Sequence, residues 1–220
     1  MKLMSLDYEK DWTPLDITLD CGIKINSPAH LDGGGLNYKT NIIKAIRNSG
    51  KEKYDRGFEW CAGFGVIGFE VLGLGLCDHM VFSDYYDVAI QDCYNTASNN
   101  NLTDKITGYV SPAIENLPEE EIWDLVVANP PWTFDEVATS KDYPDPNMLR
   151  ILVDQDFAIH REFYKNINAH LTDDADLYII EVNKDPKLIM LAGMHGLNLI
   201  SIYNTKNAPN GGVFHFKPRR

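Results

Sequence analysis

The stretch Asp124-Leu-Val-Val-Ala-Asn129-Pro130-Pro131-Trp132 decides the fold. Its apolar run is rich in valine and shows no polar alternation, which is typical of a strand buried on both faces within a parallel sheet. The two prolines end this strand, because proline donates no ladder hydrogen bond and pushes the preceding residue into extended geometry. Open α/β sheets bind ligands at the carboxyl ends of such strands. The sequence therefore predicts a binding crevice beside Asn129.

The exit from this strand presents three groups to the crevice: the amide side chain of Asn129, the carbonyl of Pro130 and the ring of Trp132. Two hydrogen-bond acceptors and one ring suit a substrate with a planar amino group. An isolated Asn-Pro-Pro is equally compatible with a buried strand, a rigid turn and a packed tryptophan. The chain upstream favours the first interpretation.

A length of 220 residues suits one α/β domain. We expect this domain to cover residues 28–220, preceded by an N-terminal arm of residues 1–27 that forms an ordered extension, a flap or a strand pair. No apolar run reaches the length of a membrane span, and the first residues lack the apolar core of a secretory signal, so a cytoplasmic location is expected. The four cysteines show no C-x-x-C spacing, so we expect free thiols and no metal site.

The net charge of −12 repels phosphate over the whole surface and argues against a large duplex or ribosomal footprint. A local basic segment could override this repulsion. It consists of Lys39, Lys44, Arg47, Lys51, Lys53 and Arg56, and the chain also ends in Lys217, Arg219 and Arg220. Solvated helix faces and a basic tail are the favoured interpretation of these residues.

A glycine-rich turn follows a short apolar strand that ends near Glu59. Gly63 and Gly65 allow the backbone to approach a ligand, and Gly68 permits close packing of the following helix on the strand. An acid at the strand end is unsuited to a pyrophosphate and suited to a ligand that carries an ammonium group. Such a turn alone is often structural.

A second strand, Met80 to Asp84, ends in an acid, where a carboxylate can accept hydrogen bonds from both hydroxyls of a ribose. Asp84 could instead cap the helix expected from Asp87 to Asn99. A third strand over residues 106–110 leads to Ser111. An earlier run, Gly33-Gly34-Gly35, precedes a helix expected from Lys39 to Ser49, and it suits a hinge and a ligand-approach site equally well.

The C-terminal half completes an α/β pattern. We expect a long loop over residues 133–148, a helix over 149–171, a strand over 177–182, a helix over 186–194, and two strands over 197–203 and 212–216. His160 and His170 are interpreted as ordinary helix histidines. The expected fold is a Rossmann-like, doubly wound, mostly parallel sheet with an antiparallel C-terminal hairpin.

The order of these elements, with Glu59 and its glycines, Asp84, Ser111 and Asn129-Pro-Pro-Trp at successive strand ends, resembles the class I S-adenosylmethionine-dependent methyltransferases. The resemblance is to the branch with an Asn/Asp-Pro-Pro-aromatic motif, which methylates planar nitrogens. It covers about residues 28–216.

The resemblance implies S-adenosyl-L-methionine as cofactor and N-methyltransferase activity. It assigns Asn129, Pro130 and Trp132 to catalysis. It assigns cofactor binding to Glu59, Cys61, Gly63, Gly65, Asp84, Tyr85, Ser111 and Asn129. Three departures stand out: Cys61 replaces the usual first glycine, Ser111 or Pro112 replaces a usual aspartate, and tryptophan ends the motif in place of tyrosine or phenylalanine.

Two acceptors fit this branch: a protein glutamine, and the amino group of an unpaired or flipped base in RNA or DNA. We favour a macromolecular substrate of one of these kinds over a free metabolite. We also expect no membrane association and a chain compatible with a small activating partner protein. The alternative is an inactive S-adenosylmethionine-binding or scaffold module, which the departures at Cys61 and Ser111 motivate and the intact Asn-Pro-Pro-Trp opposes.

Overall fold

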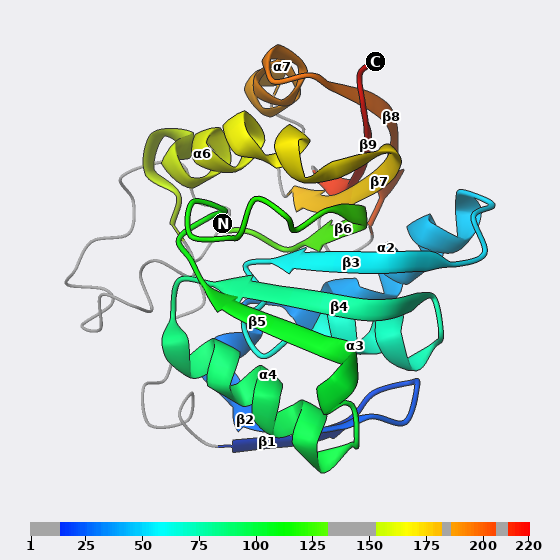
Figure 1. The fold of residues 1–220 in the computed structure, drawn as a ribbon, viewed down its shortest axis with the longest axis vertical. Helices are drawn as coiled ribbons and strands as arrows, with labels where there is room; N and C mark the ends of the chain where they lie inside the picture. The colour runs from blue at the N-terminus through cyan, green and yellow to red at the C-terminus, as the bar shows by residue number, and fades with distance from the viewer. Residues whose placement is uncertain (1–13, 132–152, 182–185, 206–210) are drawn as a thin grey trace.

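The structure, a computed structural model, describes residues 14–131, 153–181, 186–205 and 211–220. A central seven-stranded sheet has the strand order β5-β4-β3-β6-β7-β9-β8 (Figure 1). Its strands are β3 (Tyr54–Trp60), β4 (Cys77–Asp84), β5 (Ile106–Val110), β6 (Trp123–Ala128), β7 (Leu171–Glu181), β8 (Leu197–Asn204) and β9 (Gly212–Pro218). The first five are parallel, and β9 pairs antiparallel with both β7 and β8. The expected doubly wound sheet with an antiparallel C-terminal edge is confirmed.

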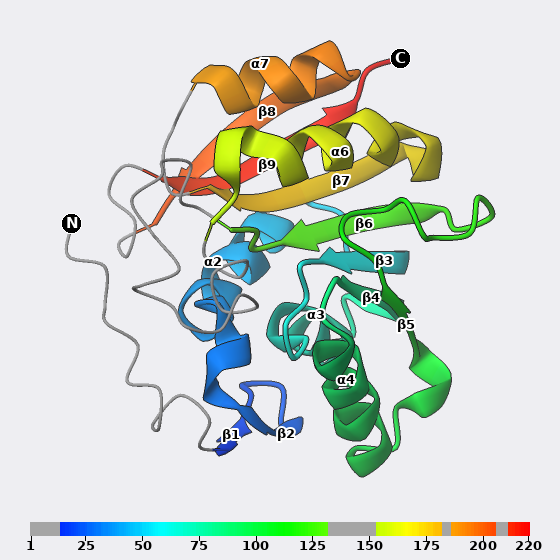
Figure 2. The same ribbon diagram turned by 90° about the vertical axis from the view of Figure 1, so that its left-hand side faces the viewer.

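Helices cover both faces of the sheet (Figure 2). The described helices are α2 (Gly35–Asn48), α3 (Val66–Gly73), α4 (Asp87–Asn99), α6 (Ala158–Ile167) and α7 (Pro186–Met194). Apolar side chains of α2, α3 and α4 belong to one core, and those of α6 and α7 belong to the core on the opposite face. No helix within the described ranges is long and apolar enough to span a membrane.

Strand β6 joins the two cores, which explains its apolar run over residues 125–128. Every residue of β6 is buried. Leu125 and Val127 belong to the core beneath α2 and α3, whereas Val126 and Ala128 belong to the core beneath α6. Because side chains alternate between the faces of a strand, both faces of β6 must be apolar.

Residues 14–28, in the region expected as an arm, form a strand pair. Strands β1 (Pro14–Thr18) and β2 (Lys24–Pro28) pair antiparallel as a separate two-stranded sheet. A short 3-10 helix, η1 (Ala29–Asp32), then leads into α2. The thiol of Cys21 donates a weak hydrogen bond to the Phe69 carbonyl, which holds this pair against α3.

The bounds expected for the helix over 149–171 and for the strand over 177–182 are wrong, and the expected loop over residues 133–148 lies outside the described residues. Helix α6 begins at Ala158 rather than at 149, because Asp156 and Phe157 have positive φ angles of 54° and 58° that a continuous helix does not allow. It ends at Ile167, and β7 begins at Leu171 rather than at 177. The helix from Asp87 to Asn99 and the strand from Ile106 to Val110 are confirmed.

Replacing Phe58 in β3 with alanine should destabilise the fold. Phe58 is fully buried and stacks on Trp123 of β6 with ring centroids 4.0 Å apart. Loss of a buried aromatic ring leaves a cavity and typically costs about 3–5 kcal/mol. Urea denaturation followed by circular dichroism measures the change, with Val110→Ala at an exposed site as the control. Equal free energies of unfolding for the two variants would contradict this packing.

Candidate functional site

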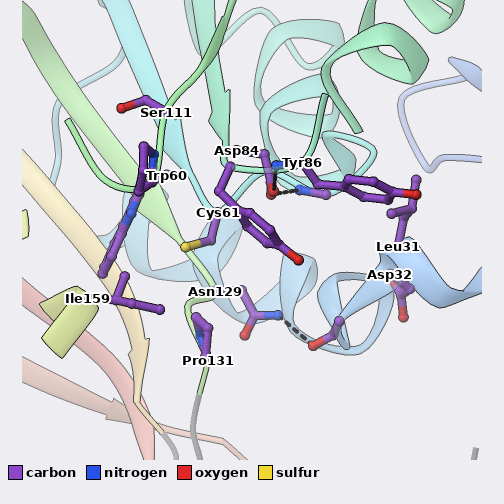
Figure 3. A pocket seen from close by; sticks show the side chains of 14 residues that line it. Leu31, Asp32, Trp60, Cys61, Asp84, Tyr86, Ser111, Asn129, Pro131 and Ile159 are labelled. Carbon is purple, nitrogen blue, oxygen red and sulfur yellow. Dashed lines mark hydrogen bonds between the residues drawn. The ribbon is translucent and has the colours of Figure 1, made fainter. Parts of the chain in front are cut away.

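One cleft lies at the carboxyl ends of β3, β4, β5 and β6 (Figure 3). It encloses about 610 Å³ of empty space when its open mouth is counted. Its walls are formed by Leu31, Asp32, Gly33, Trp60, Cys61, Gly63, Asp84, Tyr85, Tyr86, Ser111, Pro112, Asn129, Pro131 and Ile159. Residues from four neighbouring strand ends therefore meet at the edge where α/β sheets bind ligands.

The structure brings together most of the residues that the sequence nominates. Six of them line the cleft: Cys61, Gly63, Asp84, Tyr85, Ser111 and Asn129. Glu59 lies behind them and lines a smaller pocket that also includes Cys61 and Asn129. Gly65 and Pro130 line neither of these pockets, and Trp132 lies outside the described residues.

The turn after β3 needs glycine at position 63. Gly63 has a φ of 52°, and a Cβ atom at this position would lie 2.2 Å from the Leu31 carbonyl oxygen. Cys61 also has a positive φ, 54°, which costs a residue with a side chain about 1–2 kcal/mol. The position where the resemblance leads us to expect a glycine therefore keeps a glycine-like backbone conformation here.

The Asp84 carboxylate fixes this turn from the neighbouring strand. Its Oδ2 atom accepts a hydrogen bond from the Gly63 amide at 2.9 Å, and Oδ1 accepts one from the Tyr86 amide at 3.0 Å. Burial raises the pKa of Asp84 above its usual value. The residue that precedes α4 is Tyr86, so Asp84 orders the turns on both sides of the cleft rather than capping α4.

Glu59 points away from the cleft mouth. Its Oε2 atom accepts a hydrogen bond from the Gly68 amide at 2.7 Å, at the start of α3. A Cβ atom on Gly68 would lie 2.6 Å from this oxygen, so glycine is needed for the approach. Burial raises the pKa of Glu59 to about 8. Within the described residues Glu59 anchors α3, and its role toward an ammonium group stays a prediction.

The Asn129 side chain is held from one side only. Its Nδ2 atom donates a hydrogen bond to the Gly33 carbonyl at 2.9 Å, shown as the dashed line to the Gly33 oxygen in Figure 3. Its Oδ1 atom is buried and has no hydrogen-bond partner among the described residues. Buried polar atoms are normally paired, so an unpaired carbonyl oxygen in a cleft marks a position where a ligand donor would be favourable.

Residues 31–33 form a cleft wall that the sequence nominated only through its run of glycines. Leu31, Asp32 and Gly33 all line the cleft. Asp32 accepts a hydrogen bond from the Leu36 amide at 2.8 Å, and burial raises its pKa. Gly33, the first residue of the glycine run, thus lines the cleft and contacts Asn129. This position favours the interpretation of the run as a ligand-approach site over that of a hinge.

The described wall of the cleft is acidic and disfavours a phosphate group. Its wall contains the carboxylates of Asp32 and Asp84 and, in the described part of the chain, no lysine, arginine or histidine. A phosphate group would meet like charge without compensation. A cationic or neutral ligand fits this wall.

The basic segment is largely neutralised by carboxylates. Its ion pairs join Lys39 to Asp20 and Glu70, Lys51 to Asp124 and Asp174, Lys53 to Asp78, and Arg56 to Glu121. The C-terminal Lys217 and Arg220 likewise pair with Asp176 and Asp173. These pairs favour the interpretation of ordinary charged surfaces over a track for nucleic-acid phosphates.

No protein-family model and no curated protein matches the sequence. Solved structures match the fold. The 16S rRNA N2 methyltransferase of T. thermophilus, solved with AdoMet and guanosine, has a TM-score of 0.65 at 16% identity over 94% of this chain and 50% of that chain. Trm5 of Methanocaldococcus jannaschii, solved with adenosine, has a TM-score of 0.62 at 14% identity over 94% of this chain and 57% of that one.

The ribosomal protein L11 methylase of Lactobacillus delbrueckii subsp. bulgaricus has a TM-score of 0.60 at 11% identity over 84% of this chain and 79% of that chain. The chain thus spans about half the length of the first two of these structures and most of the third. These likenesses show that it has the fold of the class I S-adenosylmethionine-dependent methyltransferases.

Replacing Glu59 with glutamine should remove a pH-dependent loss of stability. The pKa of Glu59 is about 8 in the folded protein against about 4.5 in the unfolded chain. The stability contributed by Glu59 is therefore fully present below pH 4.5, and it is lost as pH rises through 8. Relative to wild type, Glu59→Gln should therefore become more stable between about pH 5 and pH 8.

Urea denaturation at both pH values measures this difference, with the exposed Glu119→Gln as the control. A wild-type minus variant difference that stays constant from pH 5 to pH 8 would show that Glu59 ionises normally.

Proposed function

We propose that the protein is an S-adenosylmethionine-dependent N-methyltransferase that acts on a planar amino or amide nitrogen of a macromolecule. One observation carries the proposal: Asn129, whose buried Oδ1 atom has no hydrogen-bond partner among the described residues, lines the same cleft as Gly63 and Asp84. An acceptor for a substrate N–H group thus shares one cavity with a turn suited to a cationic nucleoside.

The residues present fit S-adenosylmethionine. The Gly63 turn allows the ligand to approach the backbone, and the carboxylate of Asp84 can hold ribose hydroxyls. We assign Tyr85 and Ser111, which line the same cleft, to the adenine ring. The acidic wall suits a ligand with sulfonium and ammonium charges. When bound, this cofactor supplies an electrophilic methyl group on a sulfonium.

The task of the protein is to make a poor nucleophile attack. In an amide or an exocyclic base amino group the nitrogen lone pair is delocalised, and hydrogen bonds from its N–H groups to acceptors localise electron density on it. Asn129 Oδ1 and the Pro130 carbonyl are the acceptors that we assign. The Gly33 carbonyl holds the Asn129 amide so that its oxygen is available. Catalysis then comes from positioning and preorganised electrostatics.

The acceptor nitrogen belongs to a protein glutamine or to a nucleic-acid base. The ion-paired lysines and arginines and the net charge of −12 weigh against a long phosphate footprint. They leave room for a single flipped base or an amide side chain, both of which are small and neutral. The stacking role expected of Trp132 stays a prediction.

A second candidate is a binding or scaffold module without turnover. Two observations favour it: Cys61 replaces a glycine at positive φ, and the Ser111 hydroxyl accepts a hydrogen bond from the Asn116 amide at 3.3 Å instead of standing free. Methyl transfer from radiolabelled S-adenosylmethionine into fractionated RNA, DNA and protein separates the two candidates. Cofactor binding without transfer into any fraction would support the scaffold.

Replacing Asn129 with alanine should lower turnover far more than cofactor affinity, because its proposed catalytic role as acceptor outweighs its expected contribution to the cofactor site. The variant loses the acceptor that activates the nitrogen, and loss of one such preorganised group typically lowers kcat about 100-fold or more. Calorimetry should show S-adenosylmethionine affinity close to that of wild type. The exposed Asn95→Ala on α4 is the control. Full turnover in Asn129→Ala would refute the catalytic assignment.

Replacing Asp84 with alanine should have the complementary effect. It removes the acceptor for the Gly63 and Tyr86 amides, so the turn loses its fixed shape and stability falls by about 1–3 kcal/mol. We expect S-adenosylmethionine affinity to fall about 10-fold or more, because each lost interaction of 1.4 kcal/mol is tenfold in affinity. A folded Asp84→Ala protein with wild-type affinity in calorimetry would remove Asp84 from the cofactor site.

A further inference from the structure

Three fully buried ionisable side chains lie together behind the α6 side of the cleft. The Nδ1 atom of His160 lies 2.5 Å from Asp154 Oδ2, and its Nε2 atom lies 3.3 Å from Glu181 Oε1. All three side chains are 0% exposed. His160 belongs to α6, Glu181 ends β7 and Asp154 precedes α6. We call these residues the His160 cluster.

The cluster is costly to bury. Ionised groups lose their solvation when they are buried, and their mutual attraction offsets this loss only when the geometry is good. A protein with apolar residues of similar volume at these positions would often be as stable. Burial alone would lower the pKa of His160, but the carboxylates of Glu181 and Asp154 outweigh burial and raise it to about 9. The two carboxylates therefore favour the protonated imidazole.

The cluster contacts two residues of the cleft wall. The Ile159 amide donates a hydrogen bond to Asp154 Oδ1 at 2.8 Å, and the His160 amide donates one to Oδ2 at 3.1 Å. The His160 ring meets the Trp60 ring edge-on with centroids 5.4 Å apart. Ile159 and Trp60 both face the cleft that contains Asn129 (Figure 3).

The backbone beside the cluster is strained. Asp156 and Phe157 follow Asp154 and have successive positive φ angles of 54° and 58°. Residues with side chains in this conformation cost about 1–3 kcal/mol each and persist only where their surroundings determine them. Asp154 accepts hydrogen bonds from the Ile159 and His160 amides, which follow these two residues, and Ile159 lines the cleft.

A second buried histidine–aspartate pair provides a comparison within the same chain. His215 Nε2 lies 2.6 Å from Asp176 Oδ1, and both residues are buried. Asp176 pairs with Leu125 near the start of β6, at the opposite end of the strand from Asn129. Neither residue lines the cleft. Both pairs join a buried histidine to a buried aspartate, but Asp176 also contacts Lys217 and Tyr54, and only the His160 cluster contacts the cleft wall.

We propose that the His160 cluster is a positioning device, which ties the start of α6 to the end of β7 and fixes the wall of Ile159 and Trp60 so that the acceptor nitrogen is aligned with Asn129. The inference rests on the proposed methyl transfer. His160 touches no reacting atom. It acts through the wall, so its loss should affect the acceptor and leave the cofactor in place.

The test compares His160→Gln with His215→Gln. Both variants remove a buried imidazole from an aspartate. We expect His160→Gln to lower kcat/KM for the methyl acceptor by about 10-fold to 100-fold, the size of effect that a misplaced reactant produces. Calorimetry should show little change in S-adenosylmethionine affinity. Hydrogen exchange at the Ile159 and His160 amides should accelerate in this variant, and His215→Gln should change neither acceptor kinetics nor exchange at these amides.

If both variants had the wild-type kcat/KM for the methyl acceptor, the inference would be overturned. Where His160→Gln does not fold, Glu181→Gln decides, because the substituted amide keeps the shape and an oxygen acceptor while removing one charge. The same selective loss for the acceptor in Glu181→Gln supports the inference, and wild-type acceptor kinetics overturn it. A wild-type protein that binds S-adenosylmethionine and methylates no fraction overturns the proposed function itself, which is a distinct outcome.

Discussion

The hydrogen bond that the Asn129 amide donates to the Gly33 carbonyl sets the chemistry of the cleft. An asparagine amide can present either its oxygen or its nitrogen, and this bond uses the nitrogen. The oxygen is left buried and unpaired beside the Gly63 turn. The two partners are 96 positions apart in the chain, so the acceptor exists only when the N-terminal wall of residues 31–33 is packed against the end of β6.

The rest of the fold holds the two ends of this bond in place. Strand β6 is buried on both faces, which leaves its end little freedom to move. Asp84 locks the opposing turn through the Gly63 amide, and Glu59 locks the start of α3 through the Gly68 amide. Carboxylates that accept backbone hydrogen bonds thus give the cleft its shape. Asp84, together with Asp32, also gives the cleft an acidic wall that suits a cationic ligand.

The parts of the site that the sequence predicted are those tied to strand ends. In a parallel sheet, Gly63, Asp84, Ser111 and Asn129 must gather at one edge once the strands are recognised, and the structure brings them together there. The contact of Gly33 with Asn129 could not be predicted from the sequence, because a run of glycines suits a hinge and a ligand-approach site equally well. Helix α6 starts late because Asp156 and Phe157 adopt positive φ, for which their residue types give no signal.

His160 shows a related limit of sequence analysis. Its spacing within an amphipathic helix is that of an ordinary core residue, and only the three-dimensional contacts with Asp154 and Glu181 distinguish it. The available signal was an acid at the end of the apolar strand β7, where a buried carboxylate needs a partner. The acid at the end of β7 indicates that a buried carboxylate needs a positively charged partner, but it does not identify the residue that provides the charge.

The most direct test of the shared cleft is a nuclear magnetic resonance titration of the isotope-labelled protein with S-adenosylhomocysteine. The Gly63 and Tyr86 backbone amides and the Asn129 side-chain amide should shift together along one binding curve, because these groups surround one cavity. Saturating ligand that leaves these three signals unmoved, or that moves only residues outside the cleft, would contradict the account.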